Sequence, residues 1–158
     1  HPEVHYQVGA TPNGVELPRA NIQFYNSLEP RHRPVSAADV AARKRDPKWR
    51  YFWRIGDRPS ADETNFPQLN AAQVVPAAFK DEWADILDTF GGKLQAVVES
   101  VSQMLAIGLG LPVDTFTEKL RHGPHLLAPT GSDLALPELG ATVGATLAGY
   151  HYDLNFCK

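Results

Sequence analysis

A long apolar periodicity in the second half of the chain constrains the fold more than any other feature. Between residues 77 and 109, apolar side chains recur at steps of three and four residues, which is the pattern of an amphipathic α-helix. Acidic residues in the early turns suit the helix dipole, and Gly108, Gly110 and Pro112 mark the helix end. The apolar stripe is predicted to face the core, and its members are Phe79, Trp83, Ile86, Leu87, Phe90, Leu94, Val97, Val98, Val101 and Leu105.

Two adjacent glycines, Gly91 and Gly92, interrupt this helix near its middle. Each costs on the order of 1 kcal/mol relative to alanine in a helix interior. We therefore expect either a kink or a tight contact between the helix and a sheet at this point.

The first half of the chain predicts short elements joined by irregular segments. Aromatic and basic residues interleave over residues 49–55, which indicates a strand whose aromatic side chains enter the core while Arg50 and Arg54 extend to its rim. Thr11-Pro12-Asn13-Gly14 is a strong turn sequence. The other expectations are a short strand over residues 4–8, irregular chain over 17–34, a helix over 37–45 capped by Ser36, and a loop over 57–76.

A shorter helix is expected over residues 113–121, and Gly123-Pro124 ends it. His122 and His125 stand on either side of that break in a His-x-x-His spacing. Within one helix they could share a metal ion, but the Gly-Pro sequence removes the helical geometry, so no such pair is expected. Beyond them we expect a strand over residues 126–128, a turn over 130–133 and a loop over 137–140.

Length and composition exclude several classes of protein. With 158 residues the chain can form a single domain with a modest core. A net charge of −3 gives no basic surface for nucleic acid, and no apolar run approaches the roughly 20 residues of a membrane span. One cysteine, Cys157, fits a reducing compartment, so a cytoplasmic location is expected. Because the chain opens with His1, its natural N-terminus is expected to lie further upstream.

Polar and apolar residues alternate over residues 150–156, which is strand periodicity. His151, Asp153 and Asn155 then share one face of the strand, while aromatic and aliphatic side chains take the other. An imidazole and a carboxylate on one face make part of the 2-His-1-carboxylate triad that holds non-haem iron(II). His151 and Asp153 are therefore candidate metal ligands. The alternative is a strand-end histidine hydrogen-bonded to a carboxylate two residues on.

Four segments of the chain carry a resemblance to a known family. Two lie around the His-x-Asp pair: Gly-Pro-His-Leu-Leu-Ala-Pro-Thr-Gly-Ser-Asp-Leu (123–134) and Leu-Ala-Gly-Tyr-His-Tyr-Asp-Leu-Asn-Phe (147–156). Two lie upstream: Asp-Pro-Lys-Trp-Arg-Tyr-Phe-Trp-Arg (46–54) and Ala-Ile-Gly-Leu-Gly-Leu-Pro (106–112). Together they resemble the isopenicillin N synthase-like branch of the iron(II)/2-oxoglutarate-dependent oxygenases over most of the chain.

The resemblance implies an α+β fold, in which helices and strands precede a double-stranded β-helix (jelly roll) and the long helix packs on its first strands. It also implies iron(II) bound by His151 and Asp153, 2-oxoglutarate as cosubstrate, and a small-molecule substrate. The family's third iron ligand, a histidine, and its 2-oxoglutarate-binding arginine lie beyond the point where this chain ends. Residues 1–158 are thus expected to be the N-terminal portion of an oxygenase, truncated just after the His-x-Asp strand. Such a chain should be inactive alone and self-associate through the unfinished sheet.

Two departures from the family pattern bear on the site. Where much of the superfamily reads Arg-x-Asn-Tyr-Tyr-Pro before the pair, this chain reads Leu126-Leu127-Ala128-Pro129, so polar contacts to the cosubstrate are missing. Relatives continue after Asn-Phe with an aliphatic strand, whereas this chain ends in Cys157-Lys158. Cys157 would lie on the face of the site but too far along the strand to be a ligand.

Three functional interpretations remain open. The chain is a fragment of an iron(II)/2-oxoglutarate oxygenase, a shortened non-catalytic relative that binds a ligand or a partner, or a protein that completes an iron site with a partner chain. If the chain itself supplies a third ligand, His122 or His125 is first in line.

Overall fold

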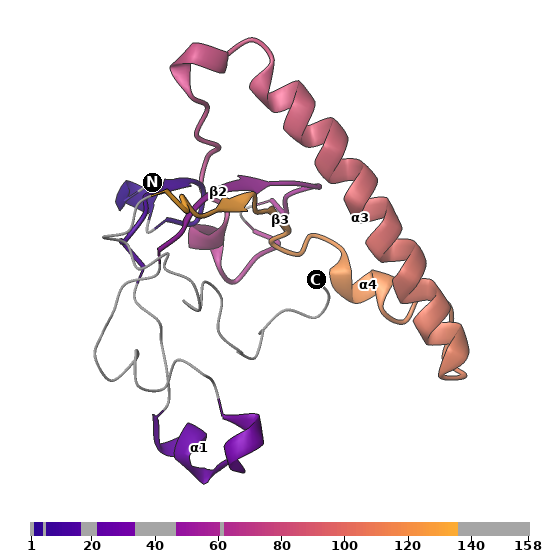
Figure 1. The fold of residues 1–158 in the computed structure, drawn as a ribbon. Coiled ribbons are helices and arrows are strands. Elements are labelled where there is room, and N and C mark those ends of the chain that lie inside the picture. Colours follow the sequence, from indigo (N-terminus) through magenta and orange to yellow (C-terminus); the bar gives the residue numbers. More distant parts are fainter. Residues whose placement is uncertain (1, 5, 17–21, 34–46, 61, 136–158) are drawn as a thin grey trace. The chain divides into compact units, whose positions relative to one another are not determined.

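The computed structural model describes residues 2–4, 6–16, 22–33, 47–60 and 62–135 (Figure 1). These residues form a mixed fold with one long helix and a sheet in which strands pair antiparallel. The chain divides into two compact units. Among the described residues, the first unit comprises residues 2–9 and 51–128, and the second comprises residues 10–50 and 129–135 with the gaps given above.

Strand β2 is the centre of the described sheet. It pairs with β1, and it pairs antiparallel with both β3 and β4. Trp53 lies opposite Leu127 in one pairing, and Trp49 lies opposite Gly131 in the other. Pro129 lies in the gap between β3 and β4. Because proline has no backbone N–H, it cannot donate a hydrogen bond to β2, which suits a break in the strand at this point. The strands are β1 (Gly9–Thr11), β2 (Trp49–Arg54), β3 (Leu126–Leu127) and β4 (Thr130–Gly131).

The strands predicted over residues 49–55 and 126–128 are confirmed as β2 and β3. The turn over residues 11–14 is also confirmed, with Gly14 at a φ of 68°. The strand predicted over residues 4–8 is wrong, because Pro2–Val4 forms a 3-10 turn (η1) and pairing begins only at Gly9. The turn predicted over residues 130–133 is also wrong at its start, where Thr130–Gly131 pairs with β2 as β4.

The irregular chain predicted over residues 17–34 contains helical segments in its described part. Helix α1 covers Ile22–Ser27, and the 3-10 turn η2 covers Pro30–His32. The guanidinium of Arg33 donates hydrogen bonds to the carbonyl oxygens of Leu28 (2.9 Å) and Asn26 (3.0 Å), which join the two segments. The helix predicted over residues 37–45 lies outside the described residues.

In the second unit, ion pairs and one close approach fix the start of β2. Glu16 forms ion pairs with Lys48 (3.6 Å) and with Arg50. Gly131 lies against the indole of Trp49, and a Cβ at this glycine would come within 2.8 Å of Trp49 Cε2. Glycine is therefore required at position 131 while Trp49 keeps this position.

Helix α3 (Trp83–Gly108) confirms the long helix predicted from the apolar periodicity. It begins later than predicted, because Ala77–Phe79 forms a separate 3-10 turn (η4) behind Pro76. Its end is a Schellman motif, in which Leu111 N–H donates to Ala106 O (2.9 Å) and Gly110 N–H to Ile107 O (3.0 Å) with Gly110 at a φ of 70°. None of the described helices combines the length and apolar character that a membrane span requires.

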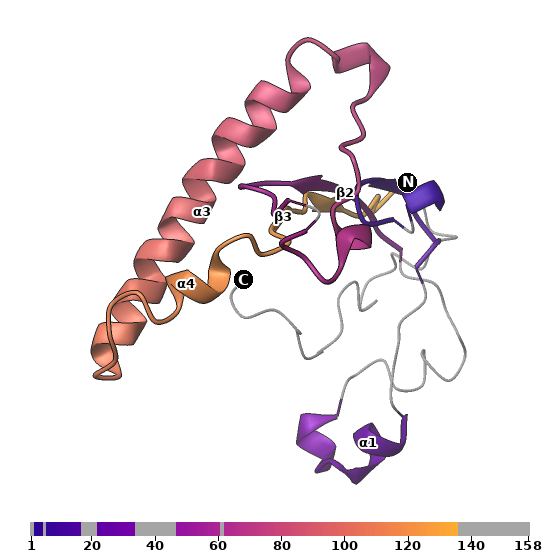
Figure 2. The same cartoon turned by 180° about the vertical axis from the view of Figure 1, so that it is seen from behind.

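The second predicted helix is shorter than expected. Helix α4 covers only Thr117–Leu120, because residues 113–116 form hydrogen-bonded turns after Pro112. It lies beside the C-terminal half of α3 (Figure 2). The loop predicted over residues 57–76 is confirmed in its described part, apart from one 3-10 turn, η3 (Pro67–Leu69).

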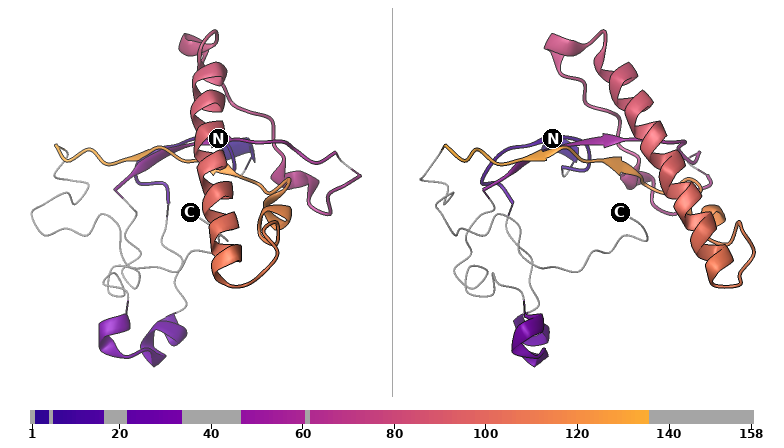
Figure 3. Two further views of the ribbon diagram at one scale, coloured as in Figure 1. Left: turned by 90° about the vertical axis from the view of Figure 1, so that its right-hand side faces the viewer. Right: turned by 45° about the vertical axis from the view of Figure 1, so that its right-hand side comes forward.

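The prediction that the apolar stripe of α3 faces the core is wrong for most of the stripe, although Trp83 and Leu87 near its start do pack against the core. Phe90 is 53% exposed and Leu105 is 50% exposed. The buried side of the helix is instead made of small residues, namely Gly91, Ser102 and Ala106. Figure 3 shows α3 crossing the strands of the first unit at a steep angle, so only one narrow side of the helix can touch them.

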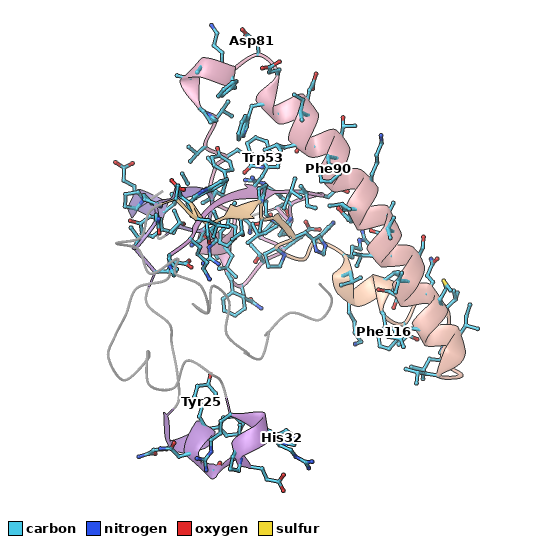
Figure 4. The ribbon with its side chains drawn as sticks, in the orientation of Figure 1. Tyr25, His32, Trp53, Asp81, Phe90 and Phe116 are labelled. Atoms are coloured by element: carbon cyan, nitrogen blue, oxygen red, sulfur yellow. The ribbon has the colours of Figure 1, made fainter. Side chains whose placement is uncertain are left out.

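The core of the first unit lies where β2 meets this small-residue side. Trp53, Ile55 and Leu127 form its buried cluster, and side chains from the start of α3 pack around them. Gly91 lies so close to Ile55 that a Cβ at this glycine would clash with Ile55 Cγ2. Of the two outcomes expected at the glycine pair, the structure therefore has the tight helix–sheet contact. Figure 4 shows Trp53 near α3. The partly buried members are Tyr51, Trp83, Ala84 and Leu87.

Candidate functional site

Both predicted metal ligands, His151 and Asp153, lie outside the described residues, as do the predicted strand over 150–156 and Cys157. Within the described part of the chain, no three histidine, cysteine, aspartate or glutamate side chains come together in a way that could hold a metal ion. The iron site therefore stays a prediction from the sequence.

The described residues do form a polar cleft in the first unit, with a volume of about 490 Å³. Its walls come from α3, from α4, from the turn after α4 and from the segment that follows β2. These segments can be followed in Figure 2. The lining residues are Asp57, Gln95, Glu99, Gln103, Thr117, Glu118, Arg121, His122 and His125.

The wall formed by α3 is a row of polar side chains four residues apart: Gln95, Glu99 and Gln103. This spacing places them on one side of the helix. Gln95 Nε2 donates a hydrogen bond to Glu99 Oε1 at 3.0 Å, which orients both side chains. Gly56, with a φ of 73°, lies against the Gln95 side chain, whose Oε1 would be 2.6 Å from a Cβ at this position. The segment after β2 thus lies close to this row.

His122 and His125 both reach the cleft, although the helix has ended before them. His122 takes a left-handed backbone conformation, with a φ of 57°. Gly123 N–H donates to Leu120 O at 2.9 Å and closes the turn. His125 Nε2 lies 2.8 Å from the same carbonyl oxygen. Because a carbonyl can only accept, Nε2 carries the hydrogen, and Nδ1 is the acceptor nitrogen of the neutral ring.

Arg54 holds this turn against β2. It was predicted to extend to the rim, which is wrong, because only 3% of the residue is exposed. Its Nη1 donates to the carbonyl oxygens of Gly123 and His125 (3.3 Å to the latter). Burial lowers the pKa of Arg54, and the positive charge of Arg58 lowers it further. Arg54 is therefore a buried cation that positions the backbone carrying His125.

Only some of the guanidinium donors of Arg54 bond to the turn that carries His125. Within the residues that the structure describes, Nε and Nη2 of Arg54 are buried and have no hydrogen-bond partner. The side chain of Gln73 bonds the backbone of Arg54 rather than its guanidinium, through Gln73 Oε1 and Arg54 N at 3.2 Å. The guanidinium therefore contributes positive charge behind the wall of the cleft.

The chemistry of the cleft is that of hydrogen bonding and charge. Carboxylates such as Glu99 and Glu118 accept hydrogen bonds, Arg121 donates them, and the imidazoles of His122 and His125 can do both. Such a mixture suits a small polar molecule with donors and acceptors of its own.

Comparison with known proteins leaves the chain without a match. No protein-family description matches it, no curated protein is similar to it, and no solved structure resembles it closely enough to count.

The sequence carried one signal for this cleft. Gln95, Glu99 and Gln103 form a polar row at four-residue spacing, and that row can be read from the sequence alone. What could not be read was its partner, because α4 and the turn at His122 reach the row only through the tertiary fold. The burial of Arg54 left no sequence signal, since Arg50 and Arg54 look alike in an alternating strand.

Proposed function

We propose that this chain is part of a non-haem iron(II), 2-oxoglutarate-dependent dioxygenase that oxidises a small molecule, with His151 and Asp153 as two of the iron ligands. The observation that carries the proposal is the His-x-Asp spacing within the alternating residues 150–156. In a strand this spacing sets an imidazole and a carboxylate on one face. The jelly roll that the family resemblance implies is part of the proposal, and a long helix beside an antiparallel sheet is compatible with it.

The donor set suits iron(II), because imidazole is a ligand of intermediate softness and a carboxylate adds a hard, charged oxygen. When bound, iron(II) and 2-oxoglutarate supply the activation of dioxygen that oxidises an unactivated carbon. The part played by this chain is to hold the metal on one face of a strand, with His151 as a neutral ligand and Asp153 as an anionic one. Two protein ligands bind weakly, so the chain alone should exchange iron freely and turn over no 2-oxoglutarate.

The test is an anaerobic titration with iron(II), with 2-oxoglutarate consumption followed in parallel. Weak binding by the unaltered chain should disappear in His151→Ala and in Asp153→Ala. His32→Ala is the matched control, because His32 is an exposed histidine of η2 and its loss should leave binding unchanged. Iron binding that survives in both His151→Ala and Asp153→Ala would overturn the proposal.

The same titration identifies a third ligand if the chain supplies one. Tight, stoichiometric iron binding that is lost both in His151→Ala and in His125→Ala would place His125 in the metal site. His122→Ala tests the neighbouring imidazole in the same way.

A second candidate function is favoured by the polar cleft: a non-catalytic module that binds a small polar ligand. Its lining of carboxylates, imidazoles and Arg121 gives a ligand both donors and acceptors. A nuclear magnetic resonance screen with small polar metabolites should then show binding that Glu99→Gln and Arg121→Ala remove. Lys93→Ala, on the same helix but outside the cleft, is the control. Absence of binding across the screen would count against this function.

A further inference from the structure

The exposed side of α3 carries an unbroken heptad pattern. Apolar residues recur at alternating steps of three and four from the first to the last, which is the spacing of a coiled-coil seam. Met104 is 70% exposed and Val97 is 60% exposed, so the seam faces away from the core of the first unit. Its members are Phe90, Leu94, Val97, Val101 and Met104.

We call this seam the α3 stripe, as distinct from the longer apolar stripe predicted from the sequence. We propose that it pairs with the same stripe on a second copy of the chain to form an antiparallel, two-fold symmetric helix pair. The inference concerns a surface of the first unit and does not depend on the proposed iron site. It also differs from self-association through the edge of a sheet, because the contact lies on a helix.

The first argument is that the stripe is self-complementary when the two helices run in opposite directions. A two-fold axis between Gln95 and Ala96 brings Phe90 level with Val101 of the second copy. The same axis brings Leu94 level with Val97 of the second copy. A large side chain thus meets a smaller one at each level, which is how well-packed layers interdigitate.

The second argument is a recess beside the stripe. A shallow, largely open hollow of about 400 Å³ is lined by residues that include Ile86, Phe90 and Lys93. In the antiparallel register, Met104 of the second copy lies at this level and on this side of the helix. Met104 is the most exposed side chain of the stripe, and an unbranched thioether adapts well to an irregular hollow.

The third argument is area. Together with Ile86 and Leu105, which are 58% and 50% exposed, the stripe presents a continuous apolar surface along the described helix. Its exposed area is on the order of 600 Å², approaching the roughly 800 Å² that each partner buries in a standard protein–protein interface. Apolar patches of this size on a monomer usually mark an interaction surface. Two-fold pairing with a second copy covers it with a surface of matching size.

The test begins with sedimentation velocity of the full chain over a wide range of concentrations. A monomer–dimer equilibrium is expected, and Val97→Glu should weaken it by about a hundredfold or more, because a charge would enter the centre of the seam. Ala96→Glu is the matched control, because Ala96 is exposed on the opposite, polar side of the helix. It should change the dissociation constant no more than about threefold, as expected for a substitution outside the contact. Circular dichroism must show that both variants remain folded.

Disulfide cross-linking tests the direction of the helices in a Cys157→Ser background. Val97→Cys lies near the two-fold axis and should form a cross-linked dimer. Ile86→Cys should not, because 19 residues separate Ile86 from its level partner Leu105, which puts the two copies of Ile86 about 28 Å apart. Efficient cross-linking of Ile86→Cys would indicate parallel helices and would overturn the proposal.

A chain that stays monomeric at every concentration also overturns the proposal. If such a monomer binds vesicles of phosphatidylcholine, the stripe contacts a lipid surface instead of a second copy. If it binds neither vesicles nor a hydrophobic dye, residues outside the described ranges cover the stripe.

Discussion

The indole nitrogen of Trp53 donates a hydrogen bond to Oδ1 of Asp88 at 2.7 Å. The bond joins the central strand to the first half of α3, and the donor belongs to a residue that is only 2% exposed. The bond holds the side of the helix that carries Asp88 toward the sheet, which is also the side on which Gln95 and Glu99 lie.

Loss of this acceptor should destabilise the fold. Asp88→Ala leaves a buried indole N–H without its partner, and the free energy of unfolding should fall by about 1.5 kcal/mol. Asp85→Ala is the control on an exposed position of the same helix, where a change within about 0.5 kcal/mol is expected. Urea denaturation followed by tryptophan fluorescence measures both. Equal effects from the two variants would mean that the bond contributes nothing specific.

The glycine pair in α3 should respond in opposite directions. Gly91→Ala places a methyl group against Ile55 and should destabilise by about 1–3 kcal/mol, the usual cost of overpacking. Gly92 has no neighbour within 4 Å of an added Cβ, so Gly92→Ala should stabilise by about 0.5–1 kcal/mol through its better helix propensity. Thermal unfolding of the two variants makes the comparison. A stabilising Gly91→Ala would show that the close contact with Ile55 is absent in solution.

Truncation of two aromatic residues should separate the core from the stripe. Trp53→Ala should lower the free energy of unfolding by about 3–5 kcal/mol, because the side chain is buried in the cluster with Ile55 and Leu127. Phe90→Ala should cost about 1 kcal/mol or less, because half of this side chain is exposed in the single chain. Both are measured by denaturation at concentrations below self-association. A large loss of unfolding free energy in Phe90→Ala under these conditions would mean that the stripe is part of the core in solution.

Ionisation of Tyr51 should make the free energy of unfolding depend on pH in the alkaline range. Its hydroxyl donates to the carbonyl oxygen of Val74, and burial raises its pKa above the ordinary 10.0, against a smaller lowering by Trp83. The folded state therefore holds this proton more tightly than the unfolded state does. The resulting contribution to stability is fully present below pH 10 and is lost as the pH rises through the raised pKa.

Tyr51→Phe should remove that part of the alkaline dependence and also lower stability at neutral pH through loss of the hydrogen bond to Val74. Tyr25→Phe, in helix α1 of the second unit, is the control and should leave the profile unchanged. The measurement is the free energy of unfolding between neutral pH and pH 11. An unchanged alkaline slope in Tyr51→Phe would contradict the assignment.

Much of the local structure could be predicted because its causes are local. The end of α3 follows from Gly110 and from Pro112 beyond it. Glycine adopts the left-handed conformation needed at position 110 without the steric cost that a Cβ would bring. The turn at Asn13-Gly14 follows from the same preference. Strand β2 follows from alternating aromatic and basic residues. The short strands β1 and β4 could not be predicted, because two or three residues carry no periodicity of their own and become strands only by pairing with β2.

The candidate metal site could also be proposed from local spacing, since His151 and Asp153 stand two residues apart in an alternating run. The polar cleft could not be predicted in this way, because Gln95 and His125 are brought to the same place by the packing of α3 and α4. Its volume and its lining depend on where the chain turns back after Leu120.

The existence of α3, its end and the apolar character of one of its sides follow from the sequence alone, because helix propensity, capping and periodicity act between residues a few positions apart. Which side is buried depends on contacts between distant parts of the chain. The burial of a helix face depends on the shape of the surface opposite it, and here that surface is made by Trp53 of β2 and by Ile55, which follows β2. The bulky stripe cannot approach it as closely as Gly91 does, so the small-residue side of α3 packs on the sheet and Phe90 faces outward.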